Sequence, residues 1–486
     1  MTKELRRLSF VMLAMFLALF VSTSWIQVVE AHALNDHDQN RRTLYDSFEV
    51  QRGSIVAGGS VVAASVPSGD VYSWQRQYTD AAMWAPVTGW ANPVLPRTTE
   101  LEQAMNQALS GTDDSQFFSR LMQIIENRPA RGSNVLLTVD PELQRIAYDA
   151  LQGYEGAIVA TEPSTGRILA MVTSPTYDTN LLASHDLGTV NDAYDQLAED
   201  PSDPLFNRAI GGDQNPPGST FKLITVSAAL SSGEYTPEST FPNPATWTIP
   251  ESTNTLHNFD RGTCGPGETV TLADALRLSC NIPMAMLAVE LGDQALREEA
   301  EKFGFNSEFE IPQRAAASKY PTEALSDGPT ALTGFGQGDV QATPLQIAMV
   351  SAAIANGGLV MNPQLVDSVV APDLTVQETF EPTEFGRALT EEVADQMREM
   401  MIANVREGAA SGARMDGVDV AGKTGTAEHG VGDPYTLWFT GFAPAESPEI
   451  AVTVMIENGG GLGQAGTSNG IAAPIAKKVI EAVLNR

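Results

Sequence analysis

Residues 223–230 form the run Leu-Ile-Thr-Val-Ser-Ala-Ala-Leu, which constrains the fold more than any other stretch of the chain. The run is apolar on almost every face of a helix, so this helix must be buried inside a large core. Pro216, Pro217 and Gly218 stop the preceding chain and let the helix begin near Ser219. A chain of 486 residues is long enough for such a core and for two or three domains.

Ser219 and Lys222 lie three residues apart on the expected helix, so the lysine amine can reach the serine hydroxyl. Burial disfavours the ammonium form and lowers the pKa of the lysine, which makes Lys222 a candidate base for Ser219. Unpaired N–H groups at the helix start favour nearby negative charge. The structural alternative is a serine that only caps the helix. The chain has only seven lysines, and an idle one would be costly on an apolar helix, which favours catalysis.

A polar triplet, Ser279-Cys280-Asn281, connects an expected helix at 272–278 to a second one that begins at Pro283. On such a connector the Ser279 hydroxyl can relay a proton, and the Asn281 amide can hold a carbonyl and an amine together. The triplet alone is equally a helix stop followed by a cap.

Lys423-Thr424-Gly425-Thr426 ends an expected strand that begins at Val418. A lysine and two hydroxyls at this place suit a carboxylate. The missing side chain at Gly425 lets a substrate backbone approach the strand, so that the substrate adds to the sheet as an extra strand. A solvated strand end is the structural alternative.

The uncharged segment 8–29 has twenty-two residues, which is long enough to cross a bilayer. Lys3, Arg6 and Arg7 precede it, so we expect a cytoplasmic N-terminus, a retained single-pass anchor and an outward-facing catalytic domain. The alternative is a cleaved signal peptide, because residues 31–33, Ala-His-Ala, fit a cleavage site.

The formal net charge of −31 argues against nucleic acid as a partner, because phosphate contact needs a basic face. Cys264 and Cys280 are the two cysteines of the chain and lie on the outward side, where a disulfide can persist. Such a bond would contribute roughly 3 kcal/mol in the chain-entropy picture. Two buried thiols are the alternative.

The pattern divides the chain into an anchor at 1–33, a second part at 34–134 and a third at 135–486. The second part alternates short strands with loops and carries no catalytic signature, so we expect a small mixed pedestal domain. Its expected elements are strands at 60–66 and 71–74 and helices at 99–109 and 117–125.

The third part begins and ends with strands and is mostly helical from 219 to 358. This order predicts one α+β domain whose antiparallel sheet is closed by its first and last segments. The expected elements are strands at 135–138, 156–161, 167–173, 418–426, 437–443 and 450–456 and helices at 141–151 and 471–484.

Three other features of the sequence suggest functions that the residues around them, or their spacing, exclude. Residues 461–466 spell a dinucleotide fingerprint, but the chain ends without the second strand that such a unit needs. Residues 466–470 spell a nucleophile elbow around Ser468, but no histidine follows it. The histidines show no metal-ligand spacing, so we expect no metal and no cofactor. They are His32, His37, His185, His257 and His429.

With its three motifs in this order, the chain resembles the penicillin-recognising serine acyltransferases. Specifically, it resembles class B penicillin-binding proteins, the monofunctional D,D-transpeptidases of the bacterial cell wall, and among them the short actinobacterial penicillin-binding protein A type. The resemblance covers residue 135 to the end. It implies an antiparallel five-stranded sheet flanked by helices, with a helical subdomain. Before residue 135 it rests on the anchor and on residues 52–55, and residues 56–59, Val-Ala-Gly-Gly, depart from the turn that many relatives have there.

The resemblance implies roles for the first two motifs. Ser219 would attack the penultimate D-alanine carbonyl of a stem peptide, and Lys222 would take its proton. Ser279 would relay a proton toward the leaving amine, while Asn281 would orient Lys222 and a substrate carbonyl.

In the third motif, Lys423, Thr424 and Thr426 would bind the terminal carboxylate. The backbone N–H groups of Ser219 and Thr426 would form the oxyanion hole, in which a single donor can matter about a hundredfold or more.

The implied partners are stem peptides ending in D-Ala-D-Ala, β-lactams, a membrane glycosyltransferase and other division proteins. Three alternatives stay open: a D,D-carboxypeptidase, a β-lactamase, and a non-catalytic β-lactam sensor or division scaffold. The glutamate pattern of one lactamase class occurs at 481–485, but it follows the third motif, which is the wrong place.

Overall fold

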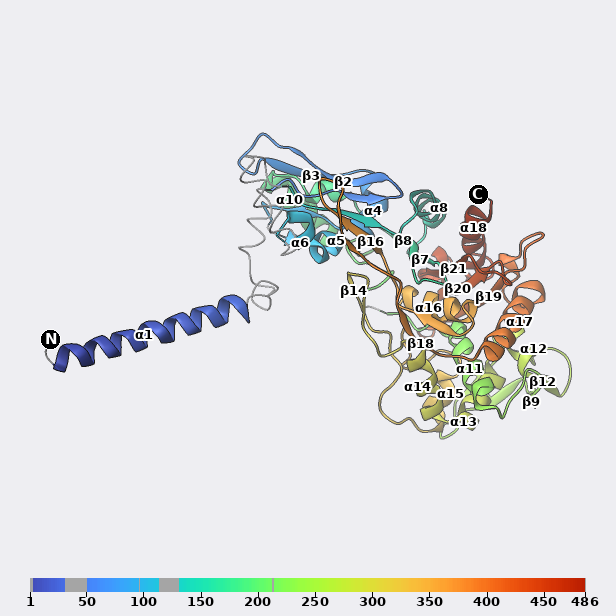
Figure 1. Ribbon diagram of the computed structural model, residues 1–486. Helices are drawn as coiled ribbons and strands as arrows, with labels where there is room; N and C mark the ends of the chain where they lie inside the picture. Colours follow the sequence, from blue (N-terminus) through green and yellow to red (C-terminus); the bar gives the residue numbers. More distant parts are fainter. Residues whose placement is uncertain (1–2, 31–49, 96, 113–130, 212–213, 486) are drawn as a thin grey trace.

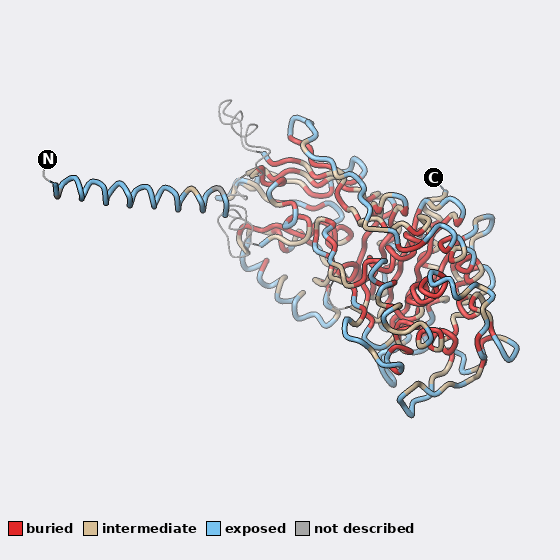
Figure 2. The backbone as a smooth tube through the Cα atoms, turned by 60° about the horizontal axis from the view of Figure 1, so that its bottom comes forward, coloured by how far each residue is buried: buried red, intermediate tan, exposed pale blue. Residues whose placement is uncertain are grey.

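The computed structural model describes residues 3–30, 50–95, 97–112, 131–211 and 214–485. Helix α1 (Lys3–Val28) stands apart from the rest and is exposed along its length (Figures 1 and 2). Its apolar part, Leu5–Gln27, is long enough to span a membrane and has no residue buried in the protein. An exposed apolar helix of this length fits the expected single-pass anchor.

A six-stranded sheet forms the first folded region, in the order β17-β16-β6-β1-β2-β3. Strands β1 and β6 pair in parallel, and the other pairs are antiparallel. Two of its strands come from much later in the chain than the others. The strands are β1 (Ile55–Ala57), β2 (Ser60–Pro67), β3 (Trp74–Tyr78), β6 (Asn134–Leu137), β16 (Val366–Val370) and β17 (Val376–Thr379).

Three local expectations for this region need comment. The strand expected at 71–74 is wrong, because residues 71–73 form a turn with Ser73 at φ 64° and β3 begins only at Trp74. The helix expected at 99–109 is two short helices, α5 (Glu100–Ala104) and α6 (Asn106–Ser110), interrupted at Met105. The helix expected at 117–125 lies outside the described residues.

A buried ion cluster holds this region together. The Glu102 carboxylate accepts hydrogen bonds from Arg52 Nη2 at 2.7 Å and Arg76 Nε at 2.5 Å. All three side chains are almost fully buried. Such an arrangement stabilises a fold only when its charges are compensated. Glu102, in α5, therefore joins Arg76 of β3 to Arg52, which lies just before β1.

A five-stranded antiparallel sheet forms the centre of the second region, in the order β19-β20-β21-β7-β8. Strands from the start and the end of this region lie side by side, so the predicted closure of the sheet by the first and last segments is confirmed. The strands are β7 (Gly156–Thr161), β8 (Ile168–Ser174), β19 (Ala421–Ala427), β20 (Thr436–Ala443) and β21 (Ile450–Ile456).

Helices cover both faces of this sheet, as the α+β prediction requires (Figure 1). Successive residues of a strand point to opposite faces: Ile158 packs with the core of α8 (Pro141–Leu151) and α18 (Ala472–Leu484), whereas Val159 packs with that of α11 (Lys222–Ser232) and α16 (Pro344–Ala355). Almost every residue of the five strands is buried, as the red parts of the tube in Figure 2 indicate. This burial explains why strands such as β7 and β21 are largely apolar, whereas β19 carries the polar third motif.

A helical subdomain lies beside the sheet, and short hairpins and turns connect its parts. Its helices are α12 (Leu272–Arg277), α13 (Asn281–Leu291), α14 (Asp293–Lys302), α15 (Asp327–Thr333) and α17 (Glu391–Glu407). The remaining helices are α4 (Ala81–Thr88), α9 (Thr179–Leu182) and α10 (Leu187–Glu199). The remaining strands are β4 (Ala91–Asn92), β5 (Arg97–Thr98), β9 (Thr240–Pro242), β10 (Thr246–Thr248), β11 (Thr255–His257), β12 (Thr269–Thr271), β13 (Phe309–Glu310), β14 (Arg314–Ala315), β15 (Leu359–Met361) and β18 (Glu384–Arg387).

Candidate active site

The three motifs meet where the start of α11, the connector before α13 and the edge strand β19 come together. Ser219 lies in a 3-10 turn, η2 (Gly218–Phe221), and α11 begins at Lys222. The expected α-helical start at Ser219 is therefore displaced by one turn. The indole of Trp438, in the strand next to β19, donates to Pro216 O at 3.1 Å and fixes the turn before Ser219.

Two glycines allow η2 to pack directly against β19. Gly218 has φ +52°, and a Cβ there would come within 2.6 Å of Thr426 O. A Cβ on Gly425 would come within 2.7 Å of Pro217 O. A side chain at either position would push the turn carrying Ser219 away from the strand. We expected the missing side chain at Gly425 to make room for a substrate. In the structure, it makes room for the turn that carries Ser219.

Lys222 is fully buried, and in the described part of the chain its side-chain amine donates two hydrogen bonds, both to the second motif. Its Nζ donates to Ser279 O at 2.7 Å and to Asn281 Oδ1 at 2.8 Å. Burial, and after it the charge of Lys423, hold the pKa of Lys222 well below its ordinary value. A neutral amine has two hydrogens, so these bonds leave its lone pair free to accept a proton. Within the described residues Ser219 Oγ has no hydrogen bond, so the expected direct contact with Lys222 is not formed here.

Lys423 is also fully buried and joins the third motif to the second. Its Nζ donates to Ser279 Oγ and Thr424 O, at 2.7 and 2.8 Å. Burial lowers the pKa of Lys423 to about 7. Because the Ser279 hydroxyl accepts from this amine, its own hydrogen is left to donate elsewhere. The motif lies within β19 rather than at its end, because the strand continues to Ala427.

The second motif is held in an unusual backbone conformation. Ser279 has φ 60°, the left-handed region that side chains disfavour. Helix α13 begins at Asn281, two residues earlier than expected, with Cys280 at its N-cap. Cys280 forms a disulfide with Cys264, with 5.7 Å between the Cα atoms, so its side chain does not cap the helix.

Asn258 supplies the missing cap from another loop. Its Oδ1 accepts from the N–H groups of Asn281 at 2.9 Å and Ile282 at 3.1 Å, and its side chain is buried. Sequence reasoning missed this residue. The local signal for it was an asparagine in a turn-rich segment, Asn258-Phe-Asp-Arg-Gly262. Such a segment is equally typical of an ordinary surface turn, so it does not indicate a helix cap.

The hydroxyls of the third motif have partners inside the protein. Thr424 Oγ1 donates to Ala409 O at 3.2 Å, and Thr426 Oγ1 lies 3.0 Å from Ser468 Oγ. Ser468 is the central serine of the pattern that spelled a nucleophile elbow. The structure places it 2.5 Å from Gly425 O instead, a contact that sequence reasoning missed.

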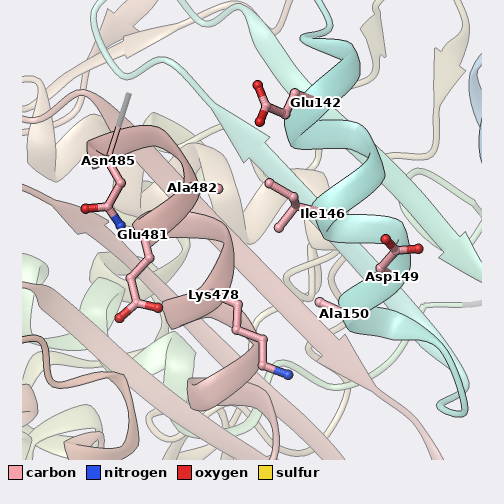
Figure 3. A pocket seen from close by; sticks show the side chains of 8 residues that line it. All are labelled: Glu142, Ile146, Asp149, Ala150, Lys478, Glu481, Ala482 and Asn485. Carbon is pink, nitrogen blue, oxygen red and sulfur yellow. The ribbon is translucent and has the colours of Figure 1, made fainter.

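The cavity between α8 and α18, of about 710 Å³, is a separate feature (Figure 3). Carboxylates and a lysine from the two helices surround it, and no residue of the three motifs lines it. It is unrelated to the site described above.

Comparison with known proteins gives matches to both regions of the chain. The family described as "Penicillin binding protein transpeptidase domain" matches residues 156–481. The family described as "Penicillin binding protein A dimerisation domain" matches residues 52–135.

Two curated relatives match along essentially the whole chain. The chain is 40% identical to "Peptidoglycan D,D-transpeptidase PbpA" of Mycolicibacterium smegmatis, covering 100% of this chain and 99% of that one. It is 39% identical to the protein of the same name from Mycobacterium tuberculosis, with the same coverage.

Solved structures give the same match in three dimensions. Penicillin-binding protein A from M. tuberculosis, as its ceftriaxone acyl-enzyme complex, has a TM-score of 0.87 and 40% sequence identity, covering 90% of this chain and 100% of that one. Its penicillin G acyl-enzyme complex has a TM-score of 0.84 with the same identity and coverage.

Proposed function

This chain belongs to the penicillin-binding transpeptidase family, and on that premise we propose that Ser219 carries the acyl group when stem peptides are crosslinked. The chain is a serine D,D-transpeptidase of peptidoglycan, the activity for which its full-length relatives are named. The residue roles are supported by one observation above all. Lys222 and Lys423 each bond to the second motif, through Ser279 O and Ser279 Oγ.

In the acylation step, the Ser219 oxygen attacks the carbonyl of the penultimate D-alanine, and neutral Lys222 accepts its proton. Backbone N–H groups of Ser219 and Thr426 stabilise the oxyanion. As the intermediate collapses, the peptide C–N bond breaks and the Ser279 hydroxyl passes a proton to the departing D-alanine amine. The Lys222 ammonium restores the Ser279 proton and becomes neutral again. The product is an ester on Ser219.

In the second step, a side-chain amine of a neighbouring stem peptide attacks this ester. Lys222 accepts a proton from this amine, the new amide C–N bond forms and the ester C–O bond to Ser219 breaks. Lys222 then gives its proton to the Ser219 oxygen, which restores the free hydroxyl. Asn281 holds Lys222 through its Oδ1 atom throughout. Lys423, Thr424 and Thr426 bind the terminal carboxylate of the donor, which lies along the edge strand β19. For this, the Thr424 and Thr426 hydroxyls turn their hydrogens toward the carboxylate and away from Ala409 O and Ser468 Oγ, their partners in this structure.

The proposal divides the chain into the anchor at 1–33, the pedestal at 34–134 and the transpeptidase domain at 135–486. Strands β6, β16 and β17, which lie almost wholly in the third part, complete the sheet of the pedestal. Lys3, Arg6 and Arg7 keep the N-terminus in the cytoplasm and place the rest outside the cell. Protease added outside intact spheroplasts should then digest the folded part; a fully protected chain would overturn this topology.

A membrane glycosyltransferase that supplies new strands, together with other division proteins, would be the partner of such an enzyme. This assignment is supported by family resemblance alone. Crosslinking in cells followed by mass spectrometry of the adducts tests it, and adducts with no glycosyltransferase would contradict it.

The test of the reaction uses the full-length protein in detergent with a stem pentapeptide and an acceptor amine. Wild type should release D-alanine and form the crosslinked product in equal amounts. Ser219→Ala should form neither, with a loss of roughly a thousandfold or more. Release of D-alanine without crosslinking would identify a carboxypeptidase and contradict the proposal.

A further inference from the structure

The segment between β21 and α18 reaches β19 from the side opposite the Ser219 turn, because α18 covers the other face of the sheet from α11. The segment is fixed in place, since Asn469 Oδ1 accepts from Gly412 N at 2.6 Å. Ser468 is 3% exposed. Its hydroxyl is the group that contacts β19.

Among the described residues, the Ser468 hydroxyl makes two hydrogen-bonding contacts, and both are with residues of the third motif. Its Oγ lies 2.5 Å from Gly425 O, to which it donates, and 3.0 Å from Thr426 Oγ1. A serine hydroxyl has a single hydrogen. Because that hydrogen goes to Gly425 O, the Thr426 hydroxyl must donate to Ser468. The result is a chain of hydrogen bonds from Thr426 through Ser468 to a backbone oxygen.

Gly425 O and the N–H of Thr426 belong to the same peptide unit. In a planar trans peptide the C=O and N–H bonds point in opposite directions. Ser468 therefore holds the oxygen end of the unit whose N–H end the proposed function assigns to the oxyanion hole. A hydrogen bond to the oxygen fixes the plane of the unit and polarises its N–H.

We propose that Ser468 is a positioning residue for the oxyanion hole, which acts by orienting and polarising the Gly425–Thr426 peptide. This inference rests on the proposed function. Removing the Ser468 hydroxyl should weaken one oxyanion donor without deleting it. We therefore expect a loss of about tenfold in acylation, less than the hundredfold or more that loss of a donor itself causes.

The experiment measures the second-order acylation constant of the full-length protein with a fluorescent penicillin. Ser468→Ala should lower this constant about tenfold. Ser468→Cys, which is similar in size but a weak donor, should also lower it and guards against a folding defect in the alanine variant. Thr467→Ala is the matched control, because the one hydrogen bond of Thr467 Oγ1 within the described part of the chain comes from Gly470 N in the same turn. It should stay within about twofold of wild type.

A second readout separates positioning from mere stability. The ester carbonyl of the acyl-enzyme absorbs at lower infrared frequency when it accepts strong hydrogen bonds. Its band should move to higher frequency in Ser468→Ala and Ser468→Cys but not in Thr467→Ala. Unchanged acylation constants and an unchanged band in both Ser468 variants would overturn the inference. If instead wild type took up no penicillin, the proposed function itself would fail, so the two failures are distinguishable.

Discussion

Lys222 and Lys423 are two buried lysines to which the proposed function assigns different tasks. Lys222 must be neutral to accept a proton, whereas Lys423 must be charged to bind a carboxylate. Burial lowers both pKa values, and the neighbouring charge of Lys423 lowers that of Lys222 further. The proposed mechanism requires that Lys222 loses its proton before Lys423 does as pH rises, and the charge of Lys423 acts in that direction.

This order predicts a bell-shaped pH dependence for acylation by penicillin. The rate should rise with pH as Lys222 becomes neutral, and should fall as Lys423 loses its charge near its pKa of about 7. Acylation constants measured from about pH 5 to pH 9 check this. The exposed Lys319 provides a control, since Lys319→Met should leave the profile unchanged. A rate that climbs steadily up to about pH 9, with no fall above the pKa of Lys423, would contradict the assignment.

At the scale of single residues, the sequence could predict Lys222 but not its partners. Its position on an apolar run already required a buried amine with a lowered pKa. The bond from Lys423 to Ser279 joins residues 144 positions apart, and no local pattern encodes such a distance. The proposed role of Ser468 could not be predicted from the sequence for the same reason. It depends on a contact with β19, a strand that precedes Ser468 by more than forty residues.

At the scale of elements, helix α13 depends on a cap that it does not carry. Asn258→Leu should remove the acceptor for two N–H groups, cost about 1 to 2 kcal/mol of stability, and slow acylation because Asn281 then shifts relative to Lys222. Asn258→Asp keeps the acceptor and adds a charge that the helix start favours, so it should retain near wild-type acylation. Denaturant unfolding and acylation constants measure the two effects.

The exposed Asn254, in the same region, provides the control for this prediction, and Asn254→Ala should be neutral in both assays. If Asn258→Leu acylated as fast as wild type, Asn258 would cap the helix without positioning the second motif.

The first and last residues of a helix or strand could be predicted where the residues that determine them lie next to them in the sequence. The Asp140-Pro141 pair gives the start of α8 to the residue, since Asp140 caps it and Pro141 is its first residue. The start of α13 was misplaced because its cap lies 23 residues upstream. The strands β7 and β21 match their expected ranges because both are continuous apolar runs.

At the scale of the whole molecule, the buried carboxylate of Glu102 tests how firmly the six-stranded sheet is held. Desolvation raises the pKa of Glu102, but Arg76 and Arg52 outweigh it, so that the pKa lies below its ordinary value. Its stabilising contribution is therefore present at neutral pH and is lost as pH falls through the lowered pKa.

Glu102→Gln should destabilise the protein by about 3 to 5 kcal/mol at pH 7, because two buried arginines lose their counter-charge. The difference from wild type should shrink in acid, where wild type also becomes protonated. Unfolding by denaturant at both pH values measures this, with the exposed Glu323→Gln as a neutral control. A difference that did not depend on pH would show that packing, not charge, is lost.

The overall architecture was predictable in outline, because strands at both ends of the second region with helices between them imply an α+β fold. The return of β16 and β17 to the first sheet was not, since residues 366–379 carry no sign of their partner. This return ties the two regions together through a second connection. Their mechanical coupling is therefore a property of the topology rather than of any local motif.

The central claim, that Ser219 is the nucleophile, has one most direct test. The full-length protein is labelled with penicillin, digested, and the acylated residue is identified by mass spectrometry. We predict one adduct per chain, on Ser219, and none in Ser219→Ala. An adduct on Ser468 or any other residue, or an unlabelled wild type, would contradict the account.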